Sequence, residues 1–218
     1  MAGRSVSERT KTVRLPPLGL EGSLEFSAKQ PDGLILFAHG SGSSRHSPRN
    51  NYVARALQDA RLATLLFDLL SEEEAAERDN VFDVDLLADR LIAATSWVGD
   101  YAATRSLPLG YFGASTGAAA ALIAAARLGD GIGAVVSRGG RPDLTGAALP
   151  HVRAPVLLIV GGDDTEVLSL NRAALRALRC EAKLEIVPGA THLFEEPGTL
   201  EAVVALARGW FAGHLARR

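Results

Sequence analysis

Cysteine is nearly absent from this chain, and neither sign of charge is in clear excess. Cys180 is the only cysteine among 218 residues, so the chain can form no internal disulfide bond. A sequence poor in cysteine is typical of reducing compartments. The formal net charge of −2 gives no electrostatic reason to expect a nucleic acid or an anionic membrane as a partner. We therefore expect neither kind of partner.

Long apolar runs and clustered metal ligands are missing as well. No apolar run approaches the roughly 18–20 residues that a membrane-spanning helix needs. Residues 1–12 are polar and charged and lack the apolar core of a secretory signal, so a cytoplasmic location is the default expectation. No histidine, cysteine or carboxylate group has metal-ligand spacing, and no G-x-G-x-x-G fingerprint is present. These absences predict a protein without a metal or another cofactor.

The composition that remains is that of an ordinary globular protein. Hydrophobic residues make up 47% of the chain and charged residues 22%. A chain of this length can bury a large core within one domain. We expect residues 1–11 to be disordered or extended and residues 12–218 to form a single domain.

Strand-like and helix-like segments alternate along most of the chain. Apolar runs predict strands at residues 34–38, 63–67, 107–112, 132–137, 155–160 and 183–187, after a leading antiparallel pair at 12–15 and 22–27. Composition and helical spacing predict helices at residues 51–60, 81–98, 116–128, 166–178 and 197–215. The acidic segment 72–77 is interpreted as a solvated loop or a helix start. This alternation predicts an α/β fold with a doubly wound, mostly parallel sheet and helices on both faces. Ligands bind beyond the carboxyl ends of the strands in such sheets.

A serine stands at the junction between one predicted strand and the helix that follows it. Residues 113–117 read Gly-Ala-Ser-Thr-Gly, a G-x-S-x-G motif centred on Ser115. On such a turn the serine hydroxyl is exposed for attack, and the glycines relieve the crowding. The helix start also directs free N–H groups toward the site, which makes the Thr116 N–H a candidate oxyanion donor. The pentapeptide alone would also fit a plain glycine-rich helix start, but its strand–helix context favours a nucleophile.

A second glycine-rich loop follows the strand at residues 34–38. A second oxyanion N–H is expected from this loop, and Ser41 is the candidate donor. Gly40 and Gly42 would let the backbone approach a substrate closely. Arg45 is a candidate substrate contact, although a solvated loop residue fits its position as well. A flexible surface turn is the alternative interpretation of the whole segment.

An acid and a base follow two later strands. His192 lies on the loop after the last predicted strand, where a general base would stand, although a lone histidine is more often a surface or core residue. Asp164 ends the sequence Gly-Gly-Asp-Asp after the strand at 155–160, where a carboxylate would orient the histidine and stabilise its imidazolium form. The adjacent Asp163 stays open as an alternative acid, and Asp143 is a third candidate.

Two arginines leave the strand at residues 132–137. Arg138 and Arg141 could each hold a substrate carboxylate through two hydrogen bonds. A structural pairing with a local acid such as Asp143 explains them equally well. Which of these applies depends on whether the two side chains face the site.

Four motifs together resemble the α/β-hydrolase superfamily, and most of all its dienelactone hydrolase-like branch. The resemblance runs over residues 12–215 and rests on residues 39–42, 113–117, 161–164 and 189–192. It implies an α/β-hydrolase fold with a catalytic triad of Ser115, Asp164 and His192, in which the G-x-x-D spacing usual in this superfamily favours Asp164 over Asp163. True dienelactone hydrolases use a cysteine nucleophile where this chain has serine, which favours ordinary ester hydrolysis. The segment from 137 to 155 is too short for the large cap domain of many relatives, so we expect an open site.

The sequence thus predicts a carboxylic ester hydrolase. It would cleave small esters, with lactones left open, through a covalent acyl-enzyme intermediate. One alternative is an acyltransferase on the same triad, because fold and triad do not fix the acceptor. Another is a non-catalytic ligand-binding protein that keeps the hydrolase fold. The expected partner is a small-molecule ester, and the oligomeric state is not predicted.

Overall fold

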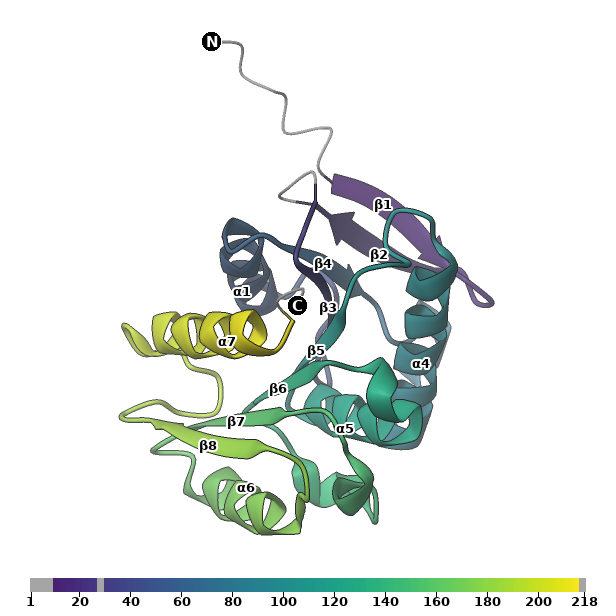
Figure 1. The fold of residues 1–218 in the computed structure, drawn as a ribbon. Helices are drawn as coiled ribbons and strands as arrows, with labels where there is room; N and C mark the ends of the chain where they lie inside the picture. Colours follow the sequence, from purple (N-terminus) through teal and green to yellow (C-terminus); the bar gives the residue numbers. More distant parts are fainter. Residues whose placement is uncertain (1–9, 27–29, 216–218) are drawn as a thin grey trace.

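A single eight-stranded sheet forms the centre of the computed structural model, which describes residues 10–26 and 30–215 (Figure 1). The spatial order is β1-β2-β4-β3-β5-β6-β7-β8. The strands are β1 (Thr10–Leu15), β2 (Leu20–Glu25), β3 (Gly33–Ala38), β4 (Leu62–Phe67), β5 (Leu109–Ala114), β6 (Ala134–Arg138), β7 (Val156–Gly161) and β8 (Ala182–Val187). Strands β3 to β8 run parallel, whereas β2 is antiparallel to both β1 and β4. The predicted α/β fold with a mostly parallel sheet is confirmed.

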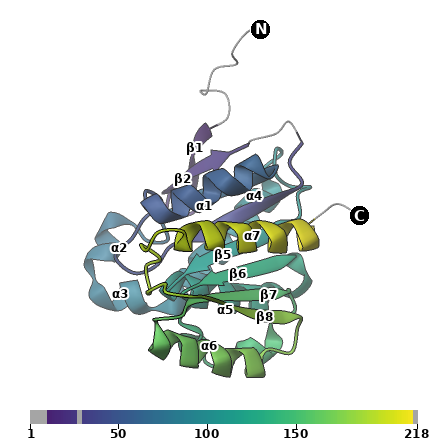
Figure 2. The same ribbon diagram turned by 90° about the vertical axis from the view of Figure 1, so that its left-hand side faces the viewer.

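Helices cover both faces of this sheet (Figures 1 and 2). Helices α1 (Pro48–Asp59) and α7 (Thr199–Leu215) lie on one face. Helices α4 (Val84–Asp100), α5 (Thr116–Leu128) and α6 (Thr165–Ala177) lie on the other. Two short helices, α2 (Glu72–Ala76) and α3 (Arg78–Phe82), connect β4 to α4. The carboxyl ends of the parallel strands lead into loops at one edge of the sheet, and the predicted site residues lie on these loops.

Burial explains why the central segments form strands. Every residue of β3, β4 and β7 is buried, as expected of parallel strands that are covered on both faces. Alternate side chains enter two separate cores: Leu36 and Tyr111 pack toward α4 and α5, and Phe37 and Phe112 toward α1 and α7. The rings of Phe37 and Phe112 are 5.0 Å apart. Burying each such side chain contributes about 1.5–3 kcal/mol to folding.

Most predicted boundaries are close to the observed ones. Helix α5 has the predicted bounds, and its alanine-rich sequence lets ten of its residues be buried against the sheet and α4. Helix α4 begins three residues later than predicted, because the Asp83 carboxylate accepts a hydrogen bond from the Leu86 N–H and caps the helix there. Strand β5 also begins two residues late, since Pro108 lies before it and only offers its carbonyl to Leu34.

The start of the predicted domain and the segment expected to lack a cap can both be compared with the structure. Residues 1–9 lie outside the described residues, and Thr10 and Lys11 open β1 opposite Glu25 and Leu24. Only short 3-10 turns occupy the segment between β6 and β7, so the predicted lack of a large cap is confirmed. In the part of the chain that the structure describes, no helix combines the length and apolarity needed to cross a membrane.

Candidate active site

Ser115 occupies a strained turn between β5 and α5. Its φ of 53° and ψ of −121° place a non-glycine residue in a region that L-residues rarely adopt. Ser115 is the N-cap residue of α5, but its side chain makes no capping hydrogen bond. The hydroxyl therefore does not cap the helix. It lies at the N-terminus of α5, where the first N–H groups favour negative charge.

The flanking glycines are sterically required by this turn. A Cβ on Gly113 would lie 2.4 Å from the Ala118 Cα, and a Cβ on Gly117 would lie 2.2 Å from the Ala38 carbonyl oxygen. Both distances are far below van der Waals contact, and both neighbours are backbone atoms. The G-x-S-x-G pattern is thus a packing requirement between the serine turn, α5 and the end of β3.

His192 and Asp164 meet at the same edge of the sheet. The His192 Nδ1 lies 2.7 Å from the Asp164 Oδ2, with 14% of the Asp164 side chain exposed. An ionised carboxylate only accepts, so Nδ1 carries the proton and Nε2 presents its lone pair. Asp163 instead donates its backbone N–H to the Ala190 carbonyl, and its side chain is exposed.

Ser115 and His192 converge on one backbone segment, Arg138–Gly139. The Ser115 N–H donates to the Arg138 carbonyl at 3.2 Å, and a Cβ on Gly139 would lie 3.4 Å from the His192 ring. Gly139, with a φ of 52°, therefore leaves space for the imidazole because it has no side chain. Within the described residues, no hydrogen bond joins the Ser115 hydroxyl to His192. Such bonds are often long without substrate and shorten in the reacting complex.

The loop after β3 lies directly against the serine turn. The Ser41 N–H donates a 2.9 Å hydrogen bond to the Thr116 hydroxyl, and a Cβ on Gly40 would lie 3.1 Å from the Ser115 Cβ. Gly42 has a φ of 68° and no atom near its vacant Cβ position, so it faces open space. The two expected oxyanion donors, Ser41 and Thr116, are thus neighbours joined through the Thr116 side chain.

His39 fixes this loop to the next strand. Its Nδ1–H donates to the Gly40 carbonyl at 3.0 Å, and its Nε2 accepts the Leu69 N–H at 3.1 Å. Burial lowers the pKa of His39, although the Gly40 carbonyl and the Asp68 carboxylate oppose this shift. A neutral His39 therefore holds the Gly40 peptide in one orientation.

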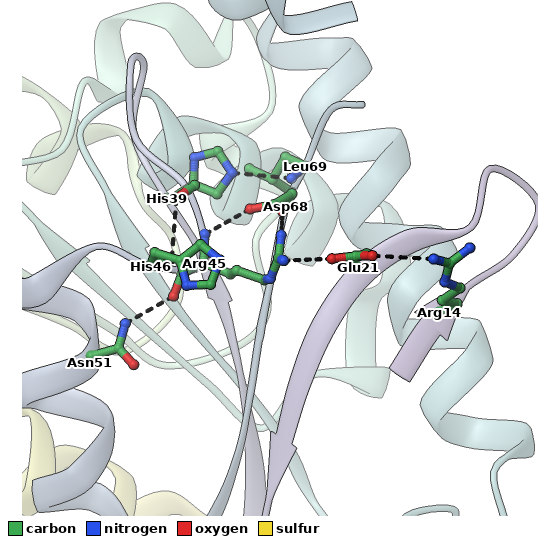
Figure 3. Close-up of polar contacts among 9 residues, drawn as sticks. Arg14, Glu21, His39, Arg45, His46, Asn51, Asp68 and Leu69 are labelled. Atoms are coloured by element: carbon green, nitrogen blue, oxygen red, sulfur yellow. Dashed lines mark hydrogen bonds and ion pairs between the residues drawn. The ribbon is translucent and has the colours of Figure 1, made fainter. Parts of the chain in front are cut away.

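Arg45 is held between two carboxylates (Figure 3). Its guanidinium pairs with Asp68 and reaches the Glu21 carboxylate at 2.5 Å, and its backbone N–H donates to Asp68 at 2.8 Å. Glu21 also pairs with Arg14 on β1. Arg45 thus braces the loop, and its charge is largely satisfied within the protein.

A pocket of about 650 Å³ begins at this loop. Gly40 and Ser41 form one wall of this pocket, and the β1–β2 turn and helix α2 form others. Its apolar lining comes from Leu18, Leu20, Leu70, Ala75, Val81 and Leu87. Since a Cβ on Gly40 would lie only 3.1 Å from the Ser115 Cβ, the pocket begins beside the serine turn.

The two arginines after β6 have different surroundings. Arg141 binds the Asp143 carboxylate through two hydrogen bonds of 2.8 and 2.7 Å, which raises the pKa of Arg141 and lowers that of Asp143. Arg138 is 8% exposed, and its Nε and Nη1 have no hydrogen-bond partner. Burial, together with the nearby charge of Arg49, lowers the pKa of Arg138 to about 10. Arg141 therefore matches the structural pairing with Asp143, whereas Arg138 does not.

Three residues near the site escaped the sequence reasoning. Gly139, Arg49 and Phe194 reach it only through the tertiary structure, and no local motif marks them. The positive φ of Phe194, 55°, is likewise invisible in the sequence. No group of three His, Cys, Asp or Glu side chains within residues 10–26 and 30–215 could hold a metal ion.

The sheet, the serine turn and the histidine loop are those of an α/β hydrolase. The model of the dienelactone hydrolase family matches residues 68–210, about two thirds of the chain. The chain therefore belongs to the dienelactone hydrolase family. The predicted superfamily and branch are both confirmed.

Two solved structures agree with this family, and two similar proteins carry a different name. A dienelactone hydrolase structure from Anabaena variabilis is 52% identical, has a TM-score of 0.90, and the match covers 95% of this chain and 97% of that chain. A lidless serine hydrolase from Xanthomonas campestris, 23% identical with a TM-score of 0.74 over 94% of this chain and 93% of its own, shares the fold. Two Mycobacterium tuberculosis proteins, named provisionally as phosphoribosyl transferases, are 59% identical over 199 residues. That match covers 91% of this chain and 45% of theirs, so the chain spans less than half their length.

Proposed function

We propose that this hydrolase cleaves small carboxylic esters through a triad of Ser115, His192 and Asp164. The observation that carries the proposal is the 2.7 Å hydrogen bond between His192 and Asp164. It lies at the sheet edge that also holds Ser115, whose hydroxyl does not cap α5. A carboxylate–histidine pair beside a serine on a strained turn is the arrangement of an activated nucleophile.

The first half-reaction is attack on the ester carbonyl. The Nε2 of His192 takes the proton as the Ser115 oxygen forms a bond to the carbonyl carbon, and Asp164 stabilises the resulting imidazolium. The tetrahedral intermediate then collapses, and His192 gives the proton to the leaving alcohol. Water repeats the sequence on the acyl-enzyme and releases the acid.

The oxyanion is stabilised by backbone N–H groups in this proposal. The Thr116 N–H points from the first turn of α5, where the helix dipole favours negative charge. The Ser41 N–H is the second donor, and it exchanges the Thr116 hydroxyl for the oxyanion when substrate binds. Each such donor in related chemistry is worth roughly a hundredfold in turnover.

The acyl chain lies in the 650 Å³ pocket beyond Gly40 in this proposal. Its apolar lining suits a short hydrocarbon chain, and the lack of a large cap leaves the site open. We do not propose phosphoribosyl transfer for this chain, because the proteins of that name are more than twice as long as the matched segment. The site supports acyl chemistry instead.

Hydrolysis of p-nitrophenyl acetate and butyrate by the wild type and Ser115→Ala tests the proposal. We expect turnover to fall by at least about a thousandfold in the variant, while thermal unfolding stays unchanged. A folded wild type without activity would contradict the proposed ester hydrolysis, and a variant that keeps most of the activity would remove Ser115 from the mechanism. Added alcohols would reveal acyl transfer as ester products in place of free acid.

A further inference from the structure

Arg138 is a buried cation without a counter-ion. It ends β6 with 8% of its surface exposed. The Nε and Nη1 atoms are fully buried and unpaired, and no ion pair to Arg138 exists among the described residues. Burying an unpaired charge is costly, and proteins normally place a carboxylate beside such a group. The arrangement therefore suits a guanidinium whose anionic partner is a bound ligand and not a residue of this chain.

The surroundings of Arg138 add positive charge. Arg49 lies close enough to lower the pKa of Arg138, and its own Nε is buried without a partner. Arg49 sits in the first turn of α1, a twelve-residue helix whose N-terminus also favours an anion. The nearby acid is Glu195, which meets the Arg49 Nη1 at 2.9 Å and whose side chain is 63% exposed. One exposed carboxylate thus pairs with Arg49, and among the described residues no carboxylate pairs with Arg138.

The guanidinium is also held in place. The Arg138 Cζ lies 5.8 Å from the centre of the Phe194 ring, within the range of a cation–π contact. Phe194 is 2% exposed and two residues from His192. A fixed, dry guanidinium loses little entropy when it binds an anion, and its fork matches a carboxylate or a phosphate.

The position of Arg138 relates it to the reacting groups. Its carbonyl accepts the Ser115 N–H, and the next residue, Gly139, lies beside the His192 ring, which a Cβ at that position would approach to 3.4 Å. Its side chain points to the face of α1 and α7, because it alternates with Ser137 and shares a face with Val136. The apolar pocket lies beyond the loop after β3, and Arg138 does not line it. Arg138 is thus on the histidine side, where the leaving alcohol would lie.

We propose that Arg138 and Arg49 form an oxyanion-binding site for a carboxylate or phosphate group on the alcohol portion of the substrate. This inference rests on the proposed ester hydrolysis and narrows its substrate class to anionic esters. In this proposal the ion pair between Glu195 and Arg49 breaks when the anion binds to Arg49.

Anion binding can be measured without turnover. Thermal unfolding is followed in succinate, in inorganic phosphate, and in chloride at equal ionic strength. We expect at least one of the first two to raise the Tm of the wild type by about 3 °C at ten times its Kd. The shift should be lost in Arg138→Met and Arg49→Gln and kept in Arg55→Gln, an exposed arginine on the same helix. If Arg138→Met fails to fold, the Tm shifts of Arg49→Gln and Arg55→Gln are compared instead.

Turnover then shows which oxyanion is selected. The substrates are 3-carboxyphenyl acetate, 3-acetoxyphenyl phosphate and the neutral isostere 3-carbamoylphenyl acetate, with acetate release measured by pH-stat. We expect kcat/KM to favour one anionic ester over the neutral one by roughly tenfold, mainly through KM, and Arg49→Gln to remove the preference. The inference is overturned if neither anion stabilises the wild type, if the variants respond equally, or if no anionic ester is preferred. Anion binding without any esterase activity would instead overturn only the proposed ester hydrolysis.

Discussion

Asp164 and Asp163 show how one residue position decides a chemical role. Both carboxylates follow β7, but Asp164 alone reaches the His192 Nδ1, at 2.7 Å. The neighbouring Asp163 uses its backbone to hold the Ala190 carbonyl, and its side chain faces solvent. The two positions therefore form a matched pair for testing the orienting acid.

We expect Asp164→Asn to lower kcat by roughly a hundred- to ten-thousandfold, because an amide can donate to the ring and favour the wrong tautomer. Asp163→Asn should stay within about threefold of the wild type, since an exposed side chain without a partner is replaced. Steady-state kinetics on p-nitrophenyl butyrate measures both. Equal losses in the two variants, with unchanged thermal unfolding, would show that the His192–Asp164 bond is not the orienting contact.

At the scale of elements, the serine turn was predictable because its determinants are local. Gly113, Ser115 and Gly117 are neighbours in sequence, and the change from strand to helix between them is marked by the alanines of α5. Helix α3 was not predicted as a separate helix. The acidic segment 72–77, which has no apolar periodicity, was interpreted as a solvated loop or a helix start, and in the structure it forms the short helix α2. Its helix start depends on a capping box between Ser71 and Glu74.

Long-range contacts cannot be predicted from sequence patterns. Gly139 leaves room for the His192 ring, since a Cβ there would lie 3.4 Å from it, and Arg49 lies near Arg138 although the two are far apart in the sequence. The sequence left two interpretations of Arg138 and Arg141 open. Burial separates them, since Arg141 binds Asp143 at the surface and Arg138 is enclosed.

The serine turn makes a prediction about α5 and β3 together. Gly117→Ala places a methyl group 2.2 Å from the Ala38 carbonyl oxygen and 2.4 Å from that of His39, so the turn or β3 must shift. We expect a loss of about 1–3 kcal/mol in the free energy of unfolding and a larger proportional loss of activity. Gly209→Ala in α7 meets no atom within 4 Å and should stabilise the helix by up to about 1 kcal/mol. Urea unfolding compares the two. An unchanged stability of Gly117→Ala would mean that the contact between the turn and β3 is loose.

At the scale of the whole molecule, the two sides of Ser115 differ in character. One side holds the apolar pocket, assembled from the β1–β2 turn, the loop after β3, and helices α2 to α4. The other side holds the histidine loop, Arg138 and the start of α1. A substrate that fits both sides would have a short apolar acyl group and a polar alcohol group. The pocket side can be tested by itself with esters that differ only in acyl length.

Helix α2 offers a substitution that narrows this pocket without touching the core. Ala75 is exposed and lines the pocket, whereas the next residue, Ala76, is exposed and does not. We expect Ala75→Trp to lower kcat/KM for p-nitrophenyl butyrate and hexanoate by roughly tenfold, because the indole occupies the space of the longer acyl chains. The value for p-nitrophenyl acetate should change by less than about threefold, because a single methyl group needs little of that volume. Ala76→Trp carries the same bulk on the same helix and should leave all three values near those of the wild type. If both variants behave alike, or if acetate is affected as strongly as hexanoate, the acyl chain does not lie under α2, and the open edge beside His192 becomes its place.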